Sequence, residues 1–393
     1  MNLWLVEPYY TGSHQAWADG YQAHSRHSVQ LLTLPGRFWK WRMQGGAITL
    51  ARQSQGMARP DRILASDMLN LPVFLALRED LSDVPVALYF HENQLTYPLQ
   101  PGEKRDLHYG FINLVSALRA EAVFFNSAYH LEAFFDELPR LLKHFPDYNE
   151  LWVVESLRAK SQVLPLGLDL NRLDAHRPGQ RASGRPVILW NHRWEYDKDP
   201  RTFFRALYAL ADKDLDFELI LLGESFRNQP EEFLEARRRL SERIVHFGYA
   251  EDDTLYSRLL WQADIVVSTA RHEFFGAAIV EACYCGCFPI LPRRLSYPEL
   301  IPTRYHHLCL YDDLDDLVAR LRHAVLHAEE IRTFSLQPDM ARFDWRELAP
   351  VYDRLMEEMS SDLAIESRAA PSGQYSLPER LGQEQSEDQH SPR

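Results

Sequence analysis

Short apolar runs alternate with longer amphipathic segments along most of this 393-residue chain. The runs do not alternate cleanly with polar residues, which is typical of strands covered on both faces in parallel sheets. The segments between them have helix length, so the pattern predicts an α/β fold with two parallel sheets. The expected strands of the first half are Leu3–Val6, Val29–Leu34, Arg62–Ala65, Val84–Phe90, Ala122–Asn126 and Gln162–Pro165. Those of the second half are Val187–Trp190, Phe217–Leu222, Ile244–Phe247, Ile265–Ser268, Phe288–Leu291 and His307–Tyr311.

A polar segment, DAHRPGQRASGR at residues 174–185, separates the two series of strands. Its Pro, Gly and Arg content is typical of a linker. We therefore expect one domain over residues 1–174 and a second over 175–342. An amphipathic helix is expected over 343–360 despite Pro350, and the polar residues 361–393 are expected to form a disordered tail. Two such domains imply a central cleft, lined by the loops that follow the strands.

The loop after Ile265–Ser268 carries Glu273 and Glu281, with seven residues between them. We expect a helix to begin at about Phe275 with Gly276 in its first turn, which would aim backbone N–H groups and a positive dipole end at a phosphate. Glu281 would then lie within reach of a ribose hydroxyl pair. An ordinary capped helix with acidic residues explains the same spacing.

The loop after Val187–Trp190 contains two cations, Arg193 and Lys198. Such a pair suits a diphosphate, whose charge must be neutralised as a glycosyl bond breaks. The alternative is a solvated charged loop, since three acidic residues stand beside the cations.

Two loops of the first half also follow strands. Gly12 and Ser13 suit a tight loop facing donor phosphates, with a helix starting near His14. After Val84–Phe90 come His91, Glu92, Asn93 and Gln94, and we expect these four polar groups at the cleft. A structural histidine is the alternative for His91.

The segment from Arg26 to Arg62 is basic and aromatic. It has seven Arg and Lys residues and one acidic residue, a local charge of +6, with tryptophans interleaved. Bases splayed from a single-stranded nucleic-acid loop stack on such rings while Arg and Lys meet phosphates. The expected contacts are Arg37, Trp39, Lys40, Trp41 and Arg42. A basic lid over the donor and a membrane-surface patch are the alternatives.

Composition limits the kinds of nucleic-acid, metal and membrane binding to expect of this chain. A net charge of -13 excludes indiscriminate coating of nucleic acid but not one local basic surface. Four cysteines are too few for a disulfide scaffold, and Cys283, Cys285 and Cys287 lack the usual spacing of metal ligands, so we interpret them as structural thiols. The Asp-x-Asp strings lie in acidic loops and are interpreted as solvated charge. No apolar run has the length of a membrane span, so a cytoplasmic protein without stable membrane association is expected.

The second half resembles retaining glycosyltransferases of the GT-B fold, in the family-4-like group. The Arg-x4-Lys pair is Arg193 and Lys198, and the Glu-x-Phe-Gly-x4-Glu motif is complete in EFFGAAIVE, from Glu273 to Glu281. The continuation EACYCGCFPIL is similar to Glu-Ala-x3-Gly-x-Pro. QVLPLGLDL is similar to the interdomain strand end, with Leu166 in place of Asn, and FDWRELAPVY matches the helix that crosses back to the first domain.

In the first half, EPYYTGSHQAW, YFHENQLTYP, FFNSAYHLEAF and GRFWKWRM closely resemble the tRNA-queuosine mannosyltransferase family. Members have two Rossmann-like domains and transfer mannose from GDP-mannose to the cyclopentenediol of queuosine in the anticodon of an aspartate tRNA. The resemblance thus implies an N-terminal acceptor domain, a C-terminal nucleotide-sugar domain, a tRNA partner and no metal ion.

The resemblance also implies roles for individual residues. Arg193 and Lys198 would bind the donor diphosphate, Glu273 the transferred sugar and Glu281 the ribose, while His91 or Glu92 would orient the hydroxyl or the sugar. The remaining donor-site residues are Gly12, Ser13, Phe275 and Gly276. Two alternatives stay open at this point: a GT-B enzyme acting on a lipid-linked or polysaccharide acceptor, and a catalytically idle module that binds tRNA or a nucleotide sugar.

Overall fold

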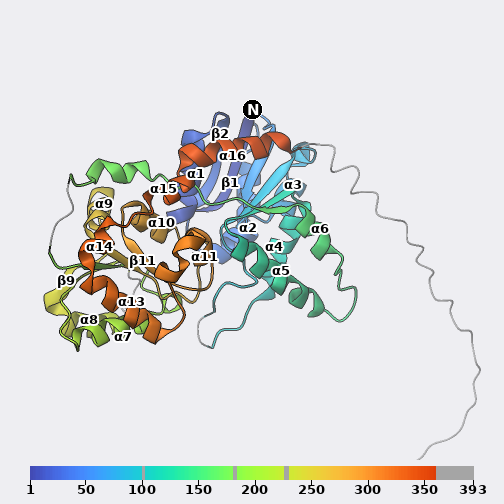
Figure 1. Ribbon diagram of the computed structural model, residues 1–393. Coiled ribbons are helices and arrows are strands. Elements are labelled where there is room, and N and C mark those ends of the chain that lie inside the picture. Colours follow the sequence, from blue (N-terminus) through green and yellow to red (C-terminus); the bar gives the residue numbers. More distant parts are fainter. Residues whose placement is uncertain (100–101, 180–183, 225–229, 360–393) are drawn as a thin grey trace, which may run out of the picture.

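Two α/β lobes lie side by side in the computed structural model, which describes residues 1–99, 102–179, 184–224 and 230–359 (Figure 1). The first lobe holds a six-stranded parallel sheet in the order β2-β1-β3-β4-β5-β6. Its strands are β1 (Asn2–Tyr10), β2 (Ser28–Pro35), β3 (Arg62–Ser66), β4 (Val86–Phe90), β5 (Ala122–Phe125) and β6 (Ser161–Val163).

The second lobe repeats this architecture in the order β12-β11-β10-β7-β8-β9. Its strands are β7 (Val187–Asn191), β8 (Glu218–Leu222), β9 (Ile244–Gly248), β10 (Ile265–Val267), β11 (Phe288–Pro292) and β12 (Leu310–Tyr311). Both β4 and β7 are buried at every position, which explains their uninterrupted apolar runs. The expectation of an α/β fold with two parallel sheets is therefore confirmed.

The prediction of a strand over His307–Tyr311 is mostly wrong. The run His307–Tyr311 is strand only at Leu310–Tyr311, because His306–Cys309 forms a short helix. His307 and Leu308 are exposed in this helical turn, so only the last two residues of the run join the sheet.

Helices cover both sheets. In the first lobe they are α1 (Gly12–His24), α2 (Trp39–Gln53), α3 (Leu71–Ala76), α4 (Leu107–Arg119), α5 (Ala128–Lys143) and α6 (Val153–Ala159). The helices that follow the first lobe in the chain are α7 (Pro200–Ala211), α8 (Glu231–Arg239), α9 (Asp253–Gln262), α10 (Ala277–Tyr284), α11 (Tyr297–Leu300), α12 (His306–Cys309), α13 (Leu314–Leu326), α14 (Ala328–Thr333), α15 (Gln337–Met340) and α16 (Trp345–Glu358). Short 3-10 turns occupy Glu79–Leu81, Asn171–His176, Tyr196–Lys198, Ser241–Arg243, Thr303–Tyr305 and Ala341–Phe343. No helix among the described residues is long and apolar enough to cross a bilayer.

The last helix, α16, returns the chain from the second lobe to the first and lies along α1 (Figure 1). Trp345 at its start is 1% exposed. Its indole occupies the space that Gly20 and Gly167 leave by having no Cβ, since an added Cβ at either position would overlap the ring. Tyr21 donates a hydrogen bond to Asp353 at 3.0 Å. Helix α16 thus connects the two lobes.

The tail expected over 361–393 and residues 180–183 of the linker lie outside the described residues.

A second junction joins α5 to the second lobe. The carboxylate of Glu299 accepts hydrogen bonds from the backbone N–H groups of Ala128 and Tyr129 at 2.7 and 2.6 Å. These N–H groups have no partner within the helix, so the carboxylate satisfies them from outside. His130 stacks on Phe274 with ring centroids 3.8 Å apart. The lobes are therefore held against each other beside the loop that carries Glu273.

Candidate active site

Two adjoining cavities lie where the carboxyl ends of the two sheets face each other. The smaller, of about 160 Å³, is bounded by the loops after β1, β4, β5, β7 and β10. Its lining residues are Ser13, His14, His91, Glu92, Tyr97, Asn126, Leu166, Arg193, Lys198, His272, Glu273, Phe274, Phe275, Gly276 and Ala277. The larger, of about 880 Å³, shares Glu92, Tyr97 and Arg193 with it. Most of the residues expected at the donor site are thus brought together.

Lys198 and Glu273 form an ion pair in the smaller cavity, although 75 positions separate them. Lys198 Nζ lies 3.4 Å from Glu273 Oε2 and 3.2 Å from Asp197 Oδ2, and it donates to the carbonyl of His272 at 2.8 Å. Burial disfavours the charged form of both partners, but their attraction prevails: the pKa of Lys198 is raised and that of Glu273 is lowered. Both side chains therefore carry charge at neutral pH.

Helix α10 begins later than expected. Its first residue is Ala277, and Gly276 is its N-cap with φ of 97°, a left-handed conformation that favours glycine. Phe275 lies before the helix, where its ring packs edge-on against Phe343. The start at Phe275 was therefore wrong, because Gly276 reverses the backbone and the aromatic ring anchors it. The N–H groups of the first turn still open onto the cavity that Gly276 and Ala277 line.

Glu281 is held by two residues that sequence reasoning missed. Arg172 donates to Oε1 at 2.5 Å and Tyr256 donates to Oε2 at 2.6 Å. Asn191 in turn donates to the Tyr256 hydroxyl at 3.0 Å. The three partners come from three different segments, so no local spacing could have revealed them. They fix the carboxylate in one orientation.

The first turn of α1 also differs from expectation. Gly12 and Ser13 belong to the helix rather than to a loop before it, and Gly12 has φ of 52°. The reason is that Thr11, in extended conformation, is the N-cap residue, so the helix begins two positions earlier than His14. Ser13 still lines the smaller cavity.

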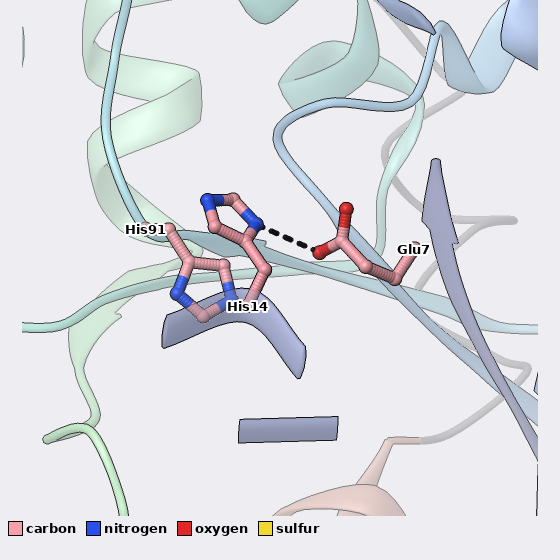
Figure 2. A group of neighbouring side chains, drawn as sticks. All are labelled: Glu7, His14 and His91. Carbon is pink, nitrogen blue, oxygen red and sulfur yellow. Dashed lines mark hydrogen bonds and ion pairs between the residues drawn. The ribbon is translucent and has the colours of Figure 1, made fainter. Parts of the chain in front are cut away.

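Glu7, His14 and His91 form a buried cluster (Figure 2), and the two histidines line the smaller cavity. Their ligand atoms lie within 4.8 Å of one another, as in a metal site. However, His14 Nδ1 contacts Glu7 Oε2 at 2.9 Å, and the two imidazoles overlap with centroids 4.1 Å apart. Burial lowers the pKa of His14, but the charge and hydrogen bond of Glu7, together with the charges of Asp67 and Glu92, raise it to about 9. A metal would have to displace the proton of His14, and in this structure the cluster is an ion pair packed against His91.

The four polar residues after β4 separate into different roles. The backbone N–H of His91 donates to Asp67 Oδ1 at 2.8 Å, and burial lowers the pKa of its ring, which is therefore neutral. Asn93 is fully buried and its Oδ1 accepts from the N–H groups of Leu95 and Thr96. The expectation that Asn93 faces the cleft was wrong, because it shapes the turn instead. Asp67, which sequence reasoning missed, also follows a strand, and the same strand-exit rule could have found it.

Only part of the basic aromatic segment reaches the cavities. Trp39 and Lys40, at the start of α2, line the larger cavity. Trp41 is 58% exposed, and Arg42 donates to the carbonyl of Pro35 at 3.0 Å, so both lie outside it. Arg37 also lies outside the lining. Two basic residues that the sequence did not lead us to expect, Lys104 and Arg105, also line the larger cavity.

Solved structures with this fold are glycosyltransferases and related sugar-processing proteins. A sucrose-phosphate synthase from Thermosynechococcus elongatus superimposes with a TM-score of 0.65 at 15% identity, covering 91% of this chain and 99% of that one. A glycosyltransferase from Rickettsia africae gives 0.66 at 15% identity, covering 91% and 98%. The glycosyl transferases group 1 profile matches residues 171–333. Fold and motifs together define a GT-B glycosyltransferase of this group.

The first lobe shows to which family of glycosyltransferases the chain belongs. The profile described as tRNA-queuosine alpha-mannosyltransferase N-terminal matches residues 2–168. The chain is 33% identical over 366 residues to the tRNA-queuosine alpha-mannosyltransferase of Drosophila melanogaster, covering 89% of this chain and 95% of that protein. A GDP-mannose:cellobiosyl-diphosphopolyprenol alpha-mannosyltransferase from Xanthomonas campestris is 24% identical over 252 residues, 62% and 64% of the two chains. This chain belongs to the tRNA-queuosine alpha-mannosyltransferase family.

Proposed function

We propose that this protein transfers mannose from GDP-mannose to queuosine in the anticodon of a tRNA, with retention of the anomeric configuration. The observation that carries the proposal is the pair of adjoining cavities. The smaller holds the Lys198–Glu273 ion pair beside the first turn of α10, and the larger opens toward Trp39 and Lys40. The sugar end of a nucleotide sugar and a base from an anticodon loop would then occupy adjoining cavities that share Glu92, Tyr97 and Arg193.

The donor would lie across the second lobe. Arg193, Lys198 and the N–H groups after Gly276 would stabilise the diphosphate as it departs, because fixed positive charge in a water-poor site needs no reorganisation. Glu273 would hold the hexose through its hydroxyls. Glu281, already oriented by Arg172 and Tyr256, would accept hydrogen bonds from the ribose.

The reaction needs no dedicated base in this arrangement. The bond between the anomeric carbon and the phosphate oxygen breaks, and a bond to an acceptor hydroxyl oxygen forms on the same face. The hydroxyl proton passes to the leaving phosphate oxygen. Neutral His91 lines the cavity where the hydroxyl would arrive and would orient it. A tRNA acceptor also favours a cytoplasmic location.

The test is to incubate the protein with a panel of nucleotide sugars and tRNA from queuosine-containing or queuosine-deficient cells, then analyse the nucleosides by mass spectrometry. We expect one added hexose, from GDP-mannose, only when queuosine is present. Glu273→Gln should abolish the product while leaving the fold intact. Transfer to lipid extracts with none to tRNA would overturn the acceptor assignment. Donor binding without turnover in any acceptor mixture would indicate an idle module.

A further inference from the structure

Glu92 stands at the boundary between the two cavities. It lines both the smaller cavity, which holds Glu273 and Lys198, and the larger one. Gln94 donates from Nε2 to Glu92 Oε1 at 3.0 Å and fixes the carboxylate in place. An acceptor that reaches from the larger cavity to the sugar would pass Glu92 together with Tyr97 and Arg193, the other residues that line both cavities.

The other inner carboxylates of the larger cavity already have cationic partners. Glu195 pairs with Arg193 at 3.2 Å, and Asp197 pairs with Lys198 at 3.2 Å. Glu103 and Asp106 also line the cavity but are exposed to solvent. Glu92 is thus the inner carboxylate placed at the passage between the two cavities.

The cations near Glu92 have their own counter-ions. His14 and Arg193 both lower the pKa of Glu92, against burial, which raises it and prevails. His14, however, contacts Glu7 at 2.9 Å, and Arg193 contacts Glu195. A half-buried carboxylate in this position gains from a further positive charge, because ionisation in a low-dielectric site is costly without one.

The larger cavity suits a nucleobase. Its volume of about 880 Å³ lies within the roughly 300–1,000 Å³ of small-molecule sites. Tyr9, Trp39, Tyr97 and Tyr109 line it, and the rings of Trp39 and Tyr109 are 5.0 Å apart. Aromatic side chains of this kind stack on bases splayed from a single-stranded loop.

Queuosine joins its base to the cyclopentenediol through a secondary amine, which is protonated at neutral pH. The amine lies only a few bonds from the hydroxyls of the ring. With the base in the larger cavity and a hydroxyl at the sugar, the ammonium must lie near the boundary. We propose that Glu92 is the counter-ion of this ammonium and so selects a cationic acceptor side chain. The inference rests on the proposed function and adds the chemistry by which the site recognises its acceptor.

The test uses synthetic tRNA anticodon stem-loops that carry either queuosine or an analogue with a methylene group in place of the amine. We expect the wild-type protein to prefer the amine by about 30-fold or more in kcat/KM, the effect of about 2 kcal/mol for truncating a buried charge pair. Glu92→Gln should reduce this preference to within about threefold, and Glu92→Asp should keep most of it. Glu155→Gln, which removes an exposed carboxylate on α6, is the matched control. Slow donor hydrolysis without tRNA should be unchanged in the control Glu155→Gln.

Two outcomes would overturn the inference. The first is equal use of both stem-loops by the wild-type protein, a comparison that needs no variant. The second is an unchanged preference in Glu92→Gln; an equal loss on both stem-loops is one form of it and would indicate a role in the chemical step instead. By contrast, no transfer to queuosine in full-length tRNA would refute the proposed function itself.

Discussion

The buried ion pair of Glu7 and His14 makes the stability of the first lobe depend on pH. The pKa of His14 is raised from 6.5 to about 9. Because a tenfold change in proton affinity corresponds to about 1.4 kcal/mol, the protonated imidazole contributes roughly 3 kcal/mol to folding. The folded-state value lies above the unfolded one. The contribution is therefore complete below pH 6.5 and is lost as the pH rises through about 9.

Replacing Glu7 by Gln removes the two largest effects that raise this pKa, the charge and the hydrogen bond. Burial lowers the pKa of His14, so the value should fall back toward 6.5 or below. The free energy of unfolding should drop by about 3 kcal/mol near pH 6, and the difference from wild type should shrink toward pH 9.5. Selective labelling of the histidines for NMR titration measures the pKa, and urea unfolding at several pH values measures the stability.

The matched control is Glu132→Gln, which breaks an exposed ion pair with Arg158 at 2.9 Å. It should cost less than about 1 kcal/mol at any pH, because water screens an exposed pair. The reasoning is refuted if His14 titrates near its ordinary value in the wild-type protein. A loss of stability in Glu7→Gln that is the same at every pH would also refute it.

Four further variants examine other parts of the molecule. Lys198→Ala should reduce turnover by about 10²–10³ without unfolding the protein, measured as mannose transfer beside a circular-dichroism spectrum. Tyr256→Phe removes one of the two hydrogen bonds to Glu281 and should raise the KM for the donor roughly tenfold, about 1.4 kcal/mol. Trp345→Ala should cost about 3–5 kcal/mol in denaturant unfolding, because it empties the buried space beside Gly20 and Gly167. Lys40→Ala should weaken tRNA binding and reduce its salt slope by about 0.7–1, with donor affinity unchanged.

Local signals account for the elements and for the motif positions. Strand positions followed from buried apolar runs, which can be recognised in the sequence without knowing the neighbouring strands. The exceptions have local causes that hydrophobicity does not report. His307 lies in a run that looks like a strand but begins with a short helical turn, and the start of α10 depends on the left-handed backbone at Gly276.

The functional residues that were missed act through distant partners. Arg172 and Tyr256 lie 109 and 25 positions from Glu281, and only the fold brings them to its carboxylate. Asn93 shows the converse, since its place in the sequence suggested the cleft while its side chain caps a turn. The direction of a side chain after a strand depends on the turn that follows, and a single sequence does not determine it.

The sequence by itself determined the two parallel sheets, the strand-exit loops and the residues that carry the glycosyltransferase motifs, because these depend on burial patterns and short spacings. The tertiary structure decided which of those residues meet. Docking of α16 on α1 and of Glu299 on α5 sets the two lobes face to face. The packing within the second lobe pairs Lys198 with Glu273, and that within the first buries Glu7 beside His14. The docking of the lobes puts Glu92 between two cavities that both lobes line. Charged groups on different elements interact only at contact distance, so their roles follow from the packing within and between the lobes.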